Sequence, residues 1–190
     1  MTTDTHIGNW LGLDGTGRRF YPLDPRPEDV TIEDIAHALS NKCRWGGRPR
    51  EFYSVCQHSV HVAQIVERTR SELTLAALLH DAAEAYLEDV PTPIKCVLWV
   101  DRACVMEPFH STELRVLDAV WQAMGLGEFV EHHAIHMADR IALATEARDL
   151  MGGLTWPGMV ATCEPTIEPL SPRAARAQFM SMFRRLTAKA

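Results

Sequence analysis

The feature that most constrains this chain is an apolar run that ends in a cluster of ionisable side chains. The run covers residues 73–79, and His80, Asp81 and Glu84 follow it directly. In a helix, offsets of three and four residues bring side chains to one face, so Glu84 is expected beside both His80 and Asp81. Ionisable groups packed against a core are costly unless they are paired or bind a metal. The cluster therefore predicts a functional site at the end of a buried helix.

The length and composition indicate one domain over residues 1–190 that can bury a core of its own. The formal charge of −6 argues against a surface that coats a nucleic-acid polymer. The sequence shows neither a signal peptide nor the apolar run of about 20 residues that a membrane span requires. Its five cysteines form no C-x-x-C pair, which indicates reduced thiols. We therefore expect a cytoplasmic protein that does not bind a membrane.

Helix signals dominate the chain after residue 30. Breaks in the pattern and capping residues delimit predicted helices at about 31–40, 54–68, 71–86, 92–104, 111–125, 128–150 and 171–187. The predicted caps are Thr31, Ser54, Ser71, Ser111 and Ser171. The preceding extension, residues 1–30, has a turn-like segment at 14–17 between two short apolar segments, a pattern typical of a small hairpin. We predict an all-α fold, a compact single-domain helical bundle with its core at about residues 31–150 and a C-terminal helix at about 171–187.

Four residues on these predicted helices are candidate ligands of one divalent metal ion. His80 and Asp81 supply an imidazole and a carboxylate, and His58 and Asp139, on the helices before and after, supply one more of each. A catalytic metal needs three or four protein ligands and an open position for water, and this set provides them. Taken alone, His58 is more typical of a core histidine that donates to a carbonyl.

A second histidine cluster leaves an alternative metal site open. His132, His133 and His136 lie at helical spacing from Asp139 and could bind zinc without the other candidates. No glutamate completes an H-E-x-x-H pattern there, so a solvated polar face is the simpler interpretation.

The order His58, His80-Asp81, Asp139 resembles the H…HD…D signature of the HD superfamily of metal-dependent phosphohydrolases. The resemblance extends over about residues 31–150 and implies the helical HD-type fold.

The segments around the four candidate ligands carry a closer resemblance. Residues 44–45, 51–59 and 80–95 are similar to bacterial 5′-deoxynucleotidases of the superfamily. Residues 35–55 are similar to small phage-type HD phosphohydrolases, which include dATP triphosphohydrolases. Trp45 stands where the phage-type proteins tend to carry phenylalanine, which favours the deoxynucleotidase arrangement.

The resemblance implies that His58, His80, Asp81 and Asp139 hold one divalent ion. Zinc, manganese, cobalt and iron all accept two imidazoles and two carboxylates, so the sequence leaves the metal open. Such an ion lowers the pKa of a bound water and polarises a phosphate oxygen. Glu84 is not needed as a ligand, and we assign it as the general acid or base.

Other residues near the ligands are predicted to bind the substrate. By the resemblance, Asp89 holds the sugar or helps to protonate the leaving 5′ oxygen. Arg44, Arg48 and Lys95 are candidates to meet the phosphate charge, because guanidinium and ammonium groups bind phosphate oxygens. Trp45 is predicted to stack on the base or to wall off the ribose.

The resulting prediction is a metal-dependent phosphohydrolase that acts on a small-molecule 2′-deoxyribonucleotide. It would cleave the 5′ phosphoester and release a deoxynucleoside with phosphate or triphosphate. Because relatives form dimers or larger rings, we expect a homo-oligomer. Two alternatives stay open: a hydrolase of another nucleotide such as guanosine tetraphosphate, and a non-catalytic metal-binding regulatory module. Glu84 distinguishes the second alternative, since a purely structural metal site has no use for an additional acid.

Overall fold

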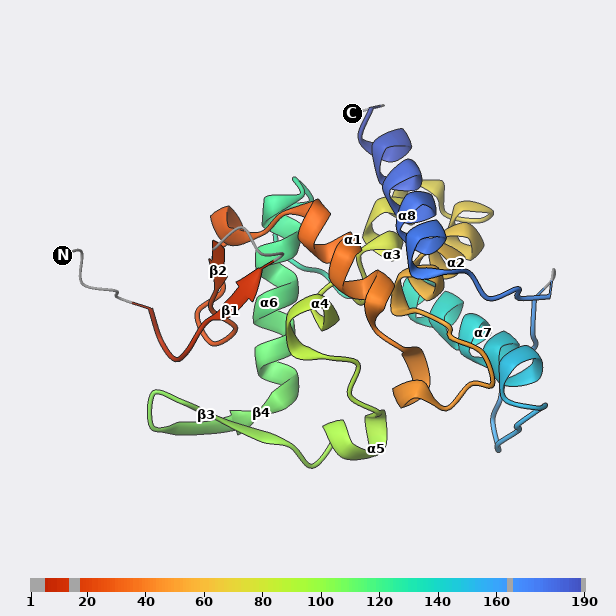
Figure 1. Cartoon of the computed structure of the whole chain (residues 1–190), viewed down its shortest axis with the longest axis horizontal. Coiled ribbons are helices and arrows are strands. Elements are labelled where there is room, and N and C mark those ends of the chain that lie inside the picture. Colours follow the sequence, from red (N-terminus) through yellow and green to blue (C-terminus); the bar gives the residue numbers. More distant parts are fainter. Residues whose placement is uncertain (1–5, 14–17, 164–165, 189–190) are drawn as a thin grey trace.

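The computed structural model describes residues 6–13, 18–163 and 166–188. Within them, helices dominate and two small antiparallel sheets accompany them (Figure 1). The α-helices are α1 (Ile32–Asn41), α2 (Val55–Glu67), α3 (Thr74–Leu78), α4 (Glu84–Leu87), α5 (Thr92–Lys95), α6 (Phe109–Ala123), α7 (His133–Leu150) and α8 (Pro172–Thr187). The strands are β1 (Leu11–Leu13), β2 (Arg18–Phe20), β3 (Trp99–Arg102) and β4 (Val105–Pro108). The fold is therefore helix-rich.

Helix α2 is the element around which the others pack. It contacts α1, α3, α7 and α8, and Figure 1 shows these helices gathered on one side of the molecule. The predicted cap is confirmed, because the Ser54 hydroxyl accepts a hydrogen bond from the Gln57 amide at 3.1 Å. Thr31 and Ser171 cap α1 and α8 in the same way, as predicted. Local capping chemistry therefore fixes where α1, α2 and α8 begin. The cap predicted at Ser111 is wrong, because α6 already begins at Phe109, after Pro108.

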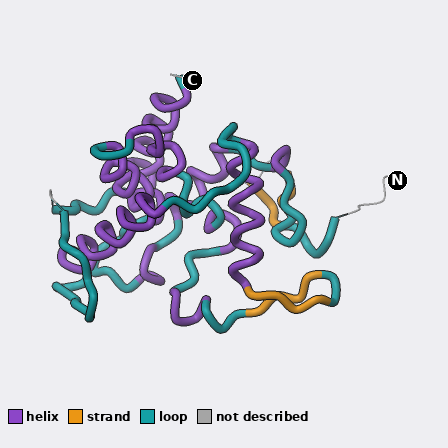
Figure 2. The backbone as a smooth tube through the Cα atoms, turned by 180° about the vertical axis from the view of Figure 1, so that it is seen from behind, coloured by secondary structure: helices purple, strands orange, loops and turns teal. Residues whose placement is uncertain are grey.

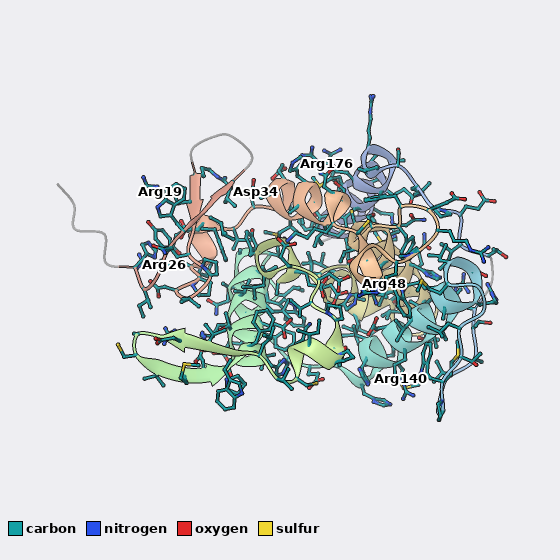
Figure 3. All side chains as sticks on the ribbon, turned by 60° about the horizontal axis from the view of Figure 1, so that its bottom comes forward. Arg19, Arg26, Asp34, Arg48, Arg140 and Arg176 are labelled. Carbon is teal, nitrogen blue, oxygen red and sulfur yellow. The ribbon has the colours of Figure 1, made fainter. Side chains whose placement is uncertain are left out.

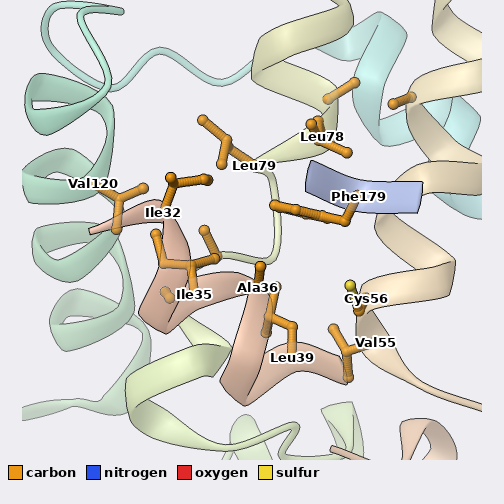
Figure 4. Packing of buried hydrophobic residues seen from close by; sticks show 14 of the residues in the cluster. Ile32, Ile35, Ala36, Leu39, Val55, Cys56, Leu78, Leu79, Val120 and Phe179 are labelled. Carbon is orange, nitrogen blue, oxygen red and sulfur yellow. The ribbon is translucent and has the colours of Figure 1, made fainter. Parts of the chain in front are cut away.

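Phe179 packs the C-terminal helix, α8, against the core. Its side chain is fully buried. In Figure 4 the ring reaches from α8 into the space between Leu78 of α3, Ala36 of α1 and Cys56 of α2. The predicted C-terminal helix is thus part of the same hydrophobic core as the helices before it.

The predicted helix over residues 71–86 is wrong in its middle. Helix α3 ends at Leu78 and α4 begins at Glu84, with tight turns between them. Amides in this segment donate to carbonyls three residues back, for example Ala82 to Leu79 and Glu84 to Asp81, at 3.1 and 3.0 Å. A regular helix would turn neighbouring side chains about 100° apart, so the turn is what lets His80 and Asp81 face one point.

The predicted helix over residues 92–104 is also wrong beyond Lys95. Strands β3 and β4 form an antiparallel hairpin there, which projects from the body below α6 (Figures 1 and 2). Its two-residue loop, Ala103 and Cys104, has positive φ angles of 52° and 68°, as a tight hairpin turn requires. β-branched and aromatic residues at 97–100 favour a strand, and the fold is for this reason not all-α.

The predicted N-terminal hairpin is confirmed, since β1 and β2 pair with Leu11 opposite Phe20. Its expected turn at residues 14–17 lies outside the described residues. The helix predicted from residue 128 begins only at His133, because Phe129 belongs to a loop and donates its amide to Asp118 at 2.8 Å. None of the helices in the described ranges is long and apolar enough to cross a membrane.

We predict that Phe179→Ala lowers the free energy of unfolding by about 3–5 kcal/mol, because it removes a large ring from a closed core. Urea unfolding followed by circular dichroism measures this change. Val97→Ala is the matched control: Val97 is 71% exposed, so its truncation should change stability by less than about 0.5 kcal/mol. An equally small effect at Phe179 would show that α8 is not part of the cooperative core.

Candidate metal centre

Three of the four predicted metal ligands form one compact group, and Asp139 lies at its edge. His58 Nε2 lies 3.3 Å from His80 Nε2, 3.4 Å from Asp81 Oδ2 and 3.1 Å from Asp139 Oδ1. His80 Nε2 lies 3.2 Å from Asp81 Oδ2 and 4.0 Å from Asp139 Oδ1. His58, His80 and Asp81 each offer a ligand atom within 4.8 Å of the others, so this group could hold a metal ion.

Three separate elements supply these side chains. His58 lies in the first turn of α2, where its amide donates to the capping residue Ser54 at 3.1 Å. His80 and Asp81 come from the turn between α3 and α4, and Asp139 comes from α7. Because α2 packs against both α3 and α7, the contacts of the central helix bring the four residues together.

The imidazole tautomers fit a metal ion. His58 Nδ1 lies 2.6 Å from the Glu146 carboxylate, and His80 Nδ1 lies 2.8 Å from the carbonyl of Ala77. A carbonyl and a carboxylate only accept hydrogen bonds, so in each neutral ring Nδ1 is the donor and Nε2 carries the lone pair. Two lone pairs then face each other at 3.3 Å, an arrangement that a cation between them stabilises.

Glu146 is a residue of this cluster that the sequence analysis missed. It is fully buried and also accepts hydrogen bonds from Arg44 Nε at 3.0 Å and Trp45 Nε1 at 2.9 Å. Burial alone would raise the pKa of a carboxyl, but the charge of Arg44 and the hydrogen bonds donated by His58 and Arg44 outweigh it and lower the pKa of Glu146 to about 2. Its spacing of two helical turns from Asp139, on the same face of α7, is the signal that could have revealed it.

Backbone hydrogen bonds join the two ends of the loop that carries Arg44 and Trp45. Arg44 donates its amide to the Tyr53 carbonyl at 2.9 Å, and Val55 donates to the Lys42 carbonyl at 3.1 Å. Inside the loop Trp45 adopts a φ of 59°, which is uncommon for a side chain of this size. A conformation of that kind persists where the surroundings hold it, and here the indole is held by Glu146.

Arg44 lies against the ligand carboxylates. Its Nη1 is 3.4 Å from Asp81 Oδ2 and its Nη2 is 3.4 Å from Asp139 Oδ1. The sequence analysis predicted that Arg44 binds substrate phosphate. In the structure Arg44 lines the cavity and also balances the charges of Asp81 and Asp139. One guanidinium can serve both, because its five N–H groups point in several directions.

A cavity of about 480 Å³ opens beside the cluster, within the size range of ligand pockets. Eight of the ten predicted site residues line it, and the other two, His58 and His80, do not. The lining residues are Arg44, Trp45, Arg48, Asp81, Glu84, Asp89, Val90, Pro91, Thr92, Pro93, Lys95, Asp139, Leu143 and Trp156. The predicted catalytic and substrate-binding residues therefore share one cavity with two of the four ligands.

Glu84 is buried at the wall of this cavity with one oxygen unsatisfied. Among the described residues, no hydrogen-bond partner meets Glu84 Oε2 or Asp89 Oδ2. Burial, reinforced by the negative charges of Asp81 and Asp89, raises the pKa of Glu84 well above the usual range of a glutamate. Burial also raises the pKa of Asp89. Carboxyl groups with pKa values raised in this way are candidates to accept and donate protons.

The remaining two predicted cations, Lys95 and Arg48, differ in the contacts that their side chains make. Lys95 pairs with Glu113 at 2.6 Å at the cavity wall. Arg48, labelled in Figure 3, is exposed and donates to the carbonyl of Trp45 at 3.0 Å. Both can reach a bound anion, and Arg48 loses less protein contact in doing so.

The alternative histidine site is not assembled. His132 and His136 line a separate cavity of about 140 Å³ that touches His80 and Asp139 from another side. Over the described ranges, His58, His80 and Asp81 form the only group of three ligand atoms close enough for a metal. Metal binding by the histidines at 132–136 alone is thus disfavoured.

We predict that Glu146→Gln weakens divalent-metal binding about 10–100-fold, because the charged acceptor that orients His58 is lost while the side-chain shape is kept. Titration of the apo-protein with Zn²⁺ or Mn²⁺ in the presence of a competing chelator measures the affinity. Glu128→Gln, at an exposed loop position, is the control and should leave it unchanged. Equal affinities in the two variants would remove Glu146 from this role.

We also predict that Glu84→Gln stabilises the metal-free protein, and more at pH 8 than at pH 5. The unfolded chain ionises Glu84 at an ordinary pKa, whereas burial raises the pKa in the folded state. The folded state therefore loses stability as the pH rises from the ordinary pKa of the unfolded chain toward the raised pKa of the folded state. Glutamine, which does not ionise, removes that loss. Urea unfolding at both pH values, with Glu128→Gln as control, tests the sign; a variant that is less stable at pH 8 contradicts it.

Comparison with known proteins places the chain among relatives. No model of a known protein family matches it. It is 37% identical over 177 residues to the uncharacterized protein YfdR of Escherichia coli K12, covering 90% of this chain and 93% of that protein. It is 36% identical over 146 residues to the uncharacterized protein RCAP_rcc00048 of Rhodobacter capsulatus, covering 72% and 71%. The chain therefore belongs to the family that YfdR and RCAP_rcc00048 represent.

Proposed function

We propose that this protein is an HD-type metal-dependent phosphohydrolase that hydrolyses the 5′ phosphoester of 2′-deoxyribonucleotides. The observation that carries the proposal is the shared cavity. A buried acid with an unsatisfied oxygen, Glu84, opens onto the same space as the ligands Asp81 and Asp139 and the cations Arg48 and Lys95. A purely structural metal site needs neither the acid nor the cavity.

His58, His80, Asp81 and Asp139 would hold the ion, and their donor set suits zinc, manganese, cobalt or iron. When bound, the ion supplies Lewis-acid chemistry and a water of lowered pKa. The Arg44 guanidinium lies 3.4 Å from each of the two ligand carboxylates, and its positive charge offsets the repulsion between them.

Glu84 orients the attacking water and takes its proton. Its raised pKa makes it a stronger base than an exposed glutamate, and its free oxygen provides the acceptor. Asp89, on the same wall, holds the sugar or protonates the leaving 5′ oxygen, for which its own raised pKa is suited. Two carboxyl groups with raised pKa values can thus divide the proton transfers between attack and departure.

The cations and the fixed indole position the substrate. Arg48 and Lys95 bind the phosphate oxygens, with Arg44 at the inner end of the cavity. Trp45 borders the sugar, because its indole N–H is tied to Glu146 and its ring cannot turn away. We further expect a homo-oligomer, as the resemblance implies.

A substrate panel tests the proposal. The purified protein is incubated with each dNMP and dNTP, their ribose counterparts and guanosine tetraphosphate, with added Zn²⁺, Mn²⁺, Co²⁺ or Fe²⁺. Released phosphate and triphosphate are measured. We expect turnover of 2′-deoxyribonucleotides above their ribose counterparts. Turnover of guanosine tetraphosphate alone would replace the substrate class, and no turnover with any compound would leave a non-catalytic metal-binding module.

We predict that Glu84→Ala lowers kcat by about 10²–10⁴-fold while one metal per chain is retained, because the residue moves a proton and is not a ligand. Metal content by mass spectrometry and kcat on the best substrate of the panel are measured together. Glu128→Gln again serves as the surface control. Loss of the metal in Glu84→Ala would show that Glu84 is a ligand, contrary to its assigned role.

A further inference from the structure

The wall of the large cavity has an apolar part that the proposed chemistry does not use. Val90, Pro91 and Pro93 follow Asp89 along the chain, and Leu143 and Trp156 complete the group. We propose that this apolar wall, with Trp156 as its stacking surface, is a subsite for the nucleobase of the substrate. This inference rests on the proposed function and adds the part of the substrate that the metal centre does not contact.

The position of the apolar wall suits a base attached to a phosphate through a sugar. Leu143 lies one helical turn beyond Asp139 on the same face of α7, about 6 Å farther along the helix axis. A group that contacts Leu143 and a group that contacts Asp139 therefore lie about one helical turn apart in the same cavity. The sugar of a nucleotide provides that displacement between its 5′ phosphate and its base.

Trp156 is held in place although it lies in a long connection between α7 and α8. Arg140, labelled in Figure 3 and adjacent to the ligand Asp139, donates to the Gly158 carbonyl at 2.9 Å. Farther along the connection, the Cys163 amide donates to Thr145 Oγ1 at 3.0 Å. Both contacts fasten the connection back onto α7. The backbone of the connection is thus held against α7 at Gly158 and at Cys163, and Trp156, two residues before Gly158, lines the cavity from this segment.

The chemistry of the wall selects a planar aromatic group without reading its edge. A tryptophan face binds any base by stacking, and proline, valine and leucine exclude water from the other contacts. In the 90–93 segment the side chain that can form a hydrogen bond is Thr92. We therefore expect all four deoxynucleoside monophosphates to bind, with purines ahead of pyrimidines because their stacked area is larger.

The test compares a substrate that has a base with one that lacks it. KM is measured for 2′-deoxyadenosine 5′-monophosphate and for 2-deoxyribose 5-phosphate, with the metal-loaded protein. Trp156→Ala should raise KM for the nucleotide about tenfold, within the range of one base–aromatic stack, and leave KM for the sugar phosphate within about twofold. Trp156→Phe should restore most of the loss. Trp99→Ala is the matched control, because Trp99 is 59% exposed on the projecting hairpin and does not line the cavity.

A binding measurement separates this inference from the proposed function. Calorimetric titration with 2′-deoxyadenosine, which has no phosphate to cleave, reports the subsite alone. Binding to the wild type that Trp156→Ala weakens about tenfold supports the subsite even if no compound is turned over, and in that case only the proposed function fails. The inference is overturned if Trp156→Ala raises both KM values equally. It is also overturned if the wild type neither binds deoxyadenosine nor prefers the nucleotide to the sugar phosphate.

Discussion

The interaction on which the site depends is the buried carboxylate of Glu146. It accepts hydrogen bonds from the His58 ring, the Arg44 guanidinium and the Trp45 indole, so one group orients a candidate metal ligand, a cation and a cavity wall. The cost of burying this charge is offset because both carboxylate oxygens are hydrogen-bonded, and the low pKa of about 2 reflects that pairing. The loop at residues 42–50 keeps its strained conformation because this anchor holds it against α7.

Two other carboxyl groups at the cavity are buried with fewer hydrogen-bond partners than Glu146 has. Glu84 and Asp89 each have an oxygen that meets no hydrogen-bond donor in the described part of the chain, and burial raises the pKa of both. Such groups lower stability, and proteins tolerate them where the unsatisfied atom acts on a ligand. The contrast between Glu146, whose oxygens are hydrogen-bonded and whose pKa is lowered, and Glu84, which keeps an unsatisfied oxygen and a raised pKa, distinguishes the supporting residue from the one that we propose to react.

Much of the helical framework was predictable because its signals are local. Thr31, Ser54 and Ser171 cap helices where the sequence analysis placed them, and each cap depends on residues only three positions apart. The hairpin of β3 and β4 was missed because its loop, Ala103 and Cys104, lacks the glycine or asparagine that usually marks such turns. The break after Leu78 was missed for a different reason: the apolar run ends only at Leu79, and the spacing of His80, Asp81 and Glu84 fits a continuous helix as well as it fits tight turns.

The sequence by itself determined which groups could do chemistry: two imidazoles and two carboxylates for a metal, an extra acid, and cations in a glycine-containing loop. Their types and order are chemical facts of the chain, and they suffice to predict a metal site. Only the tertiary structure decided that His58, the turn at residues 80–81 and Asp139 meet at one point, because helices from distant segments pack around α2. It alone added Glu146 and Trp156, since the partners of a buried charge and the walls of a cavity are set by contacts across the fold.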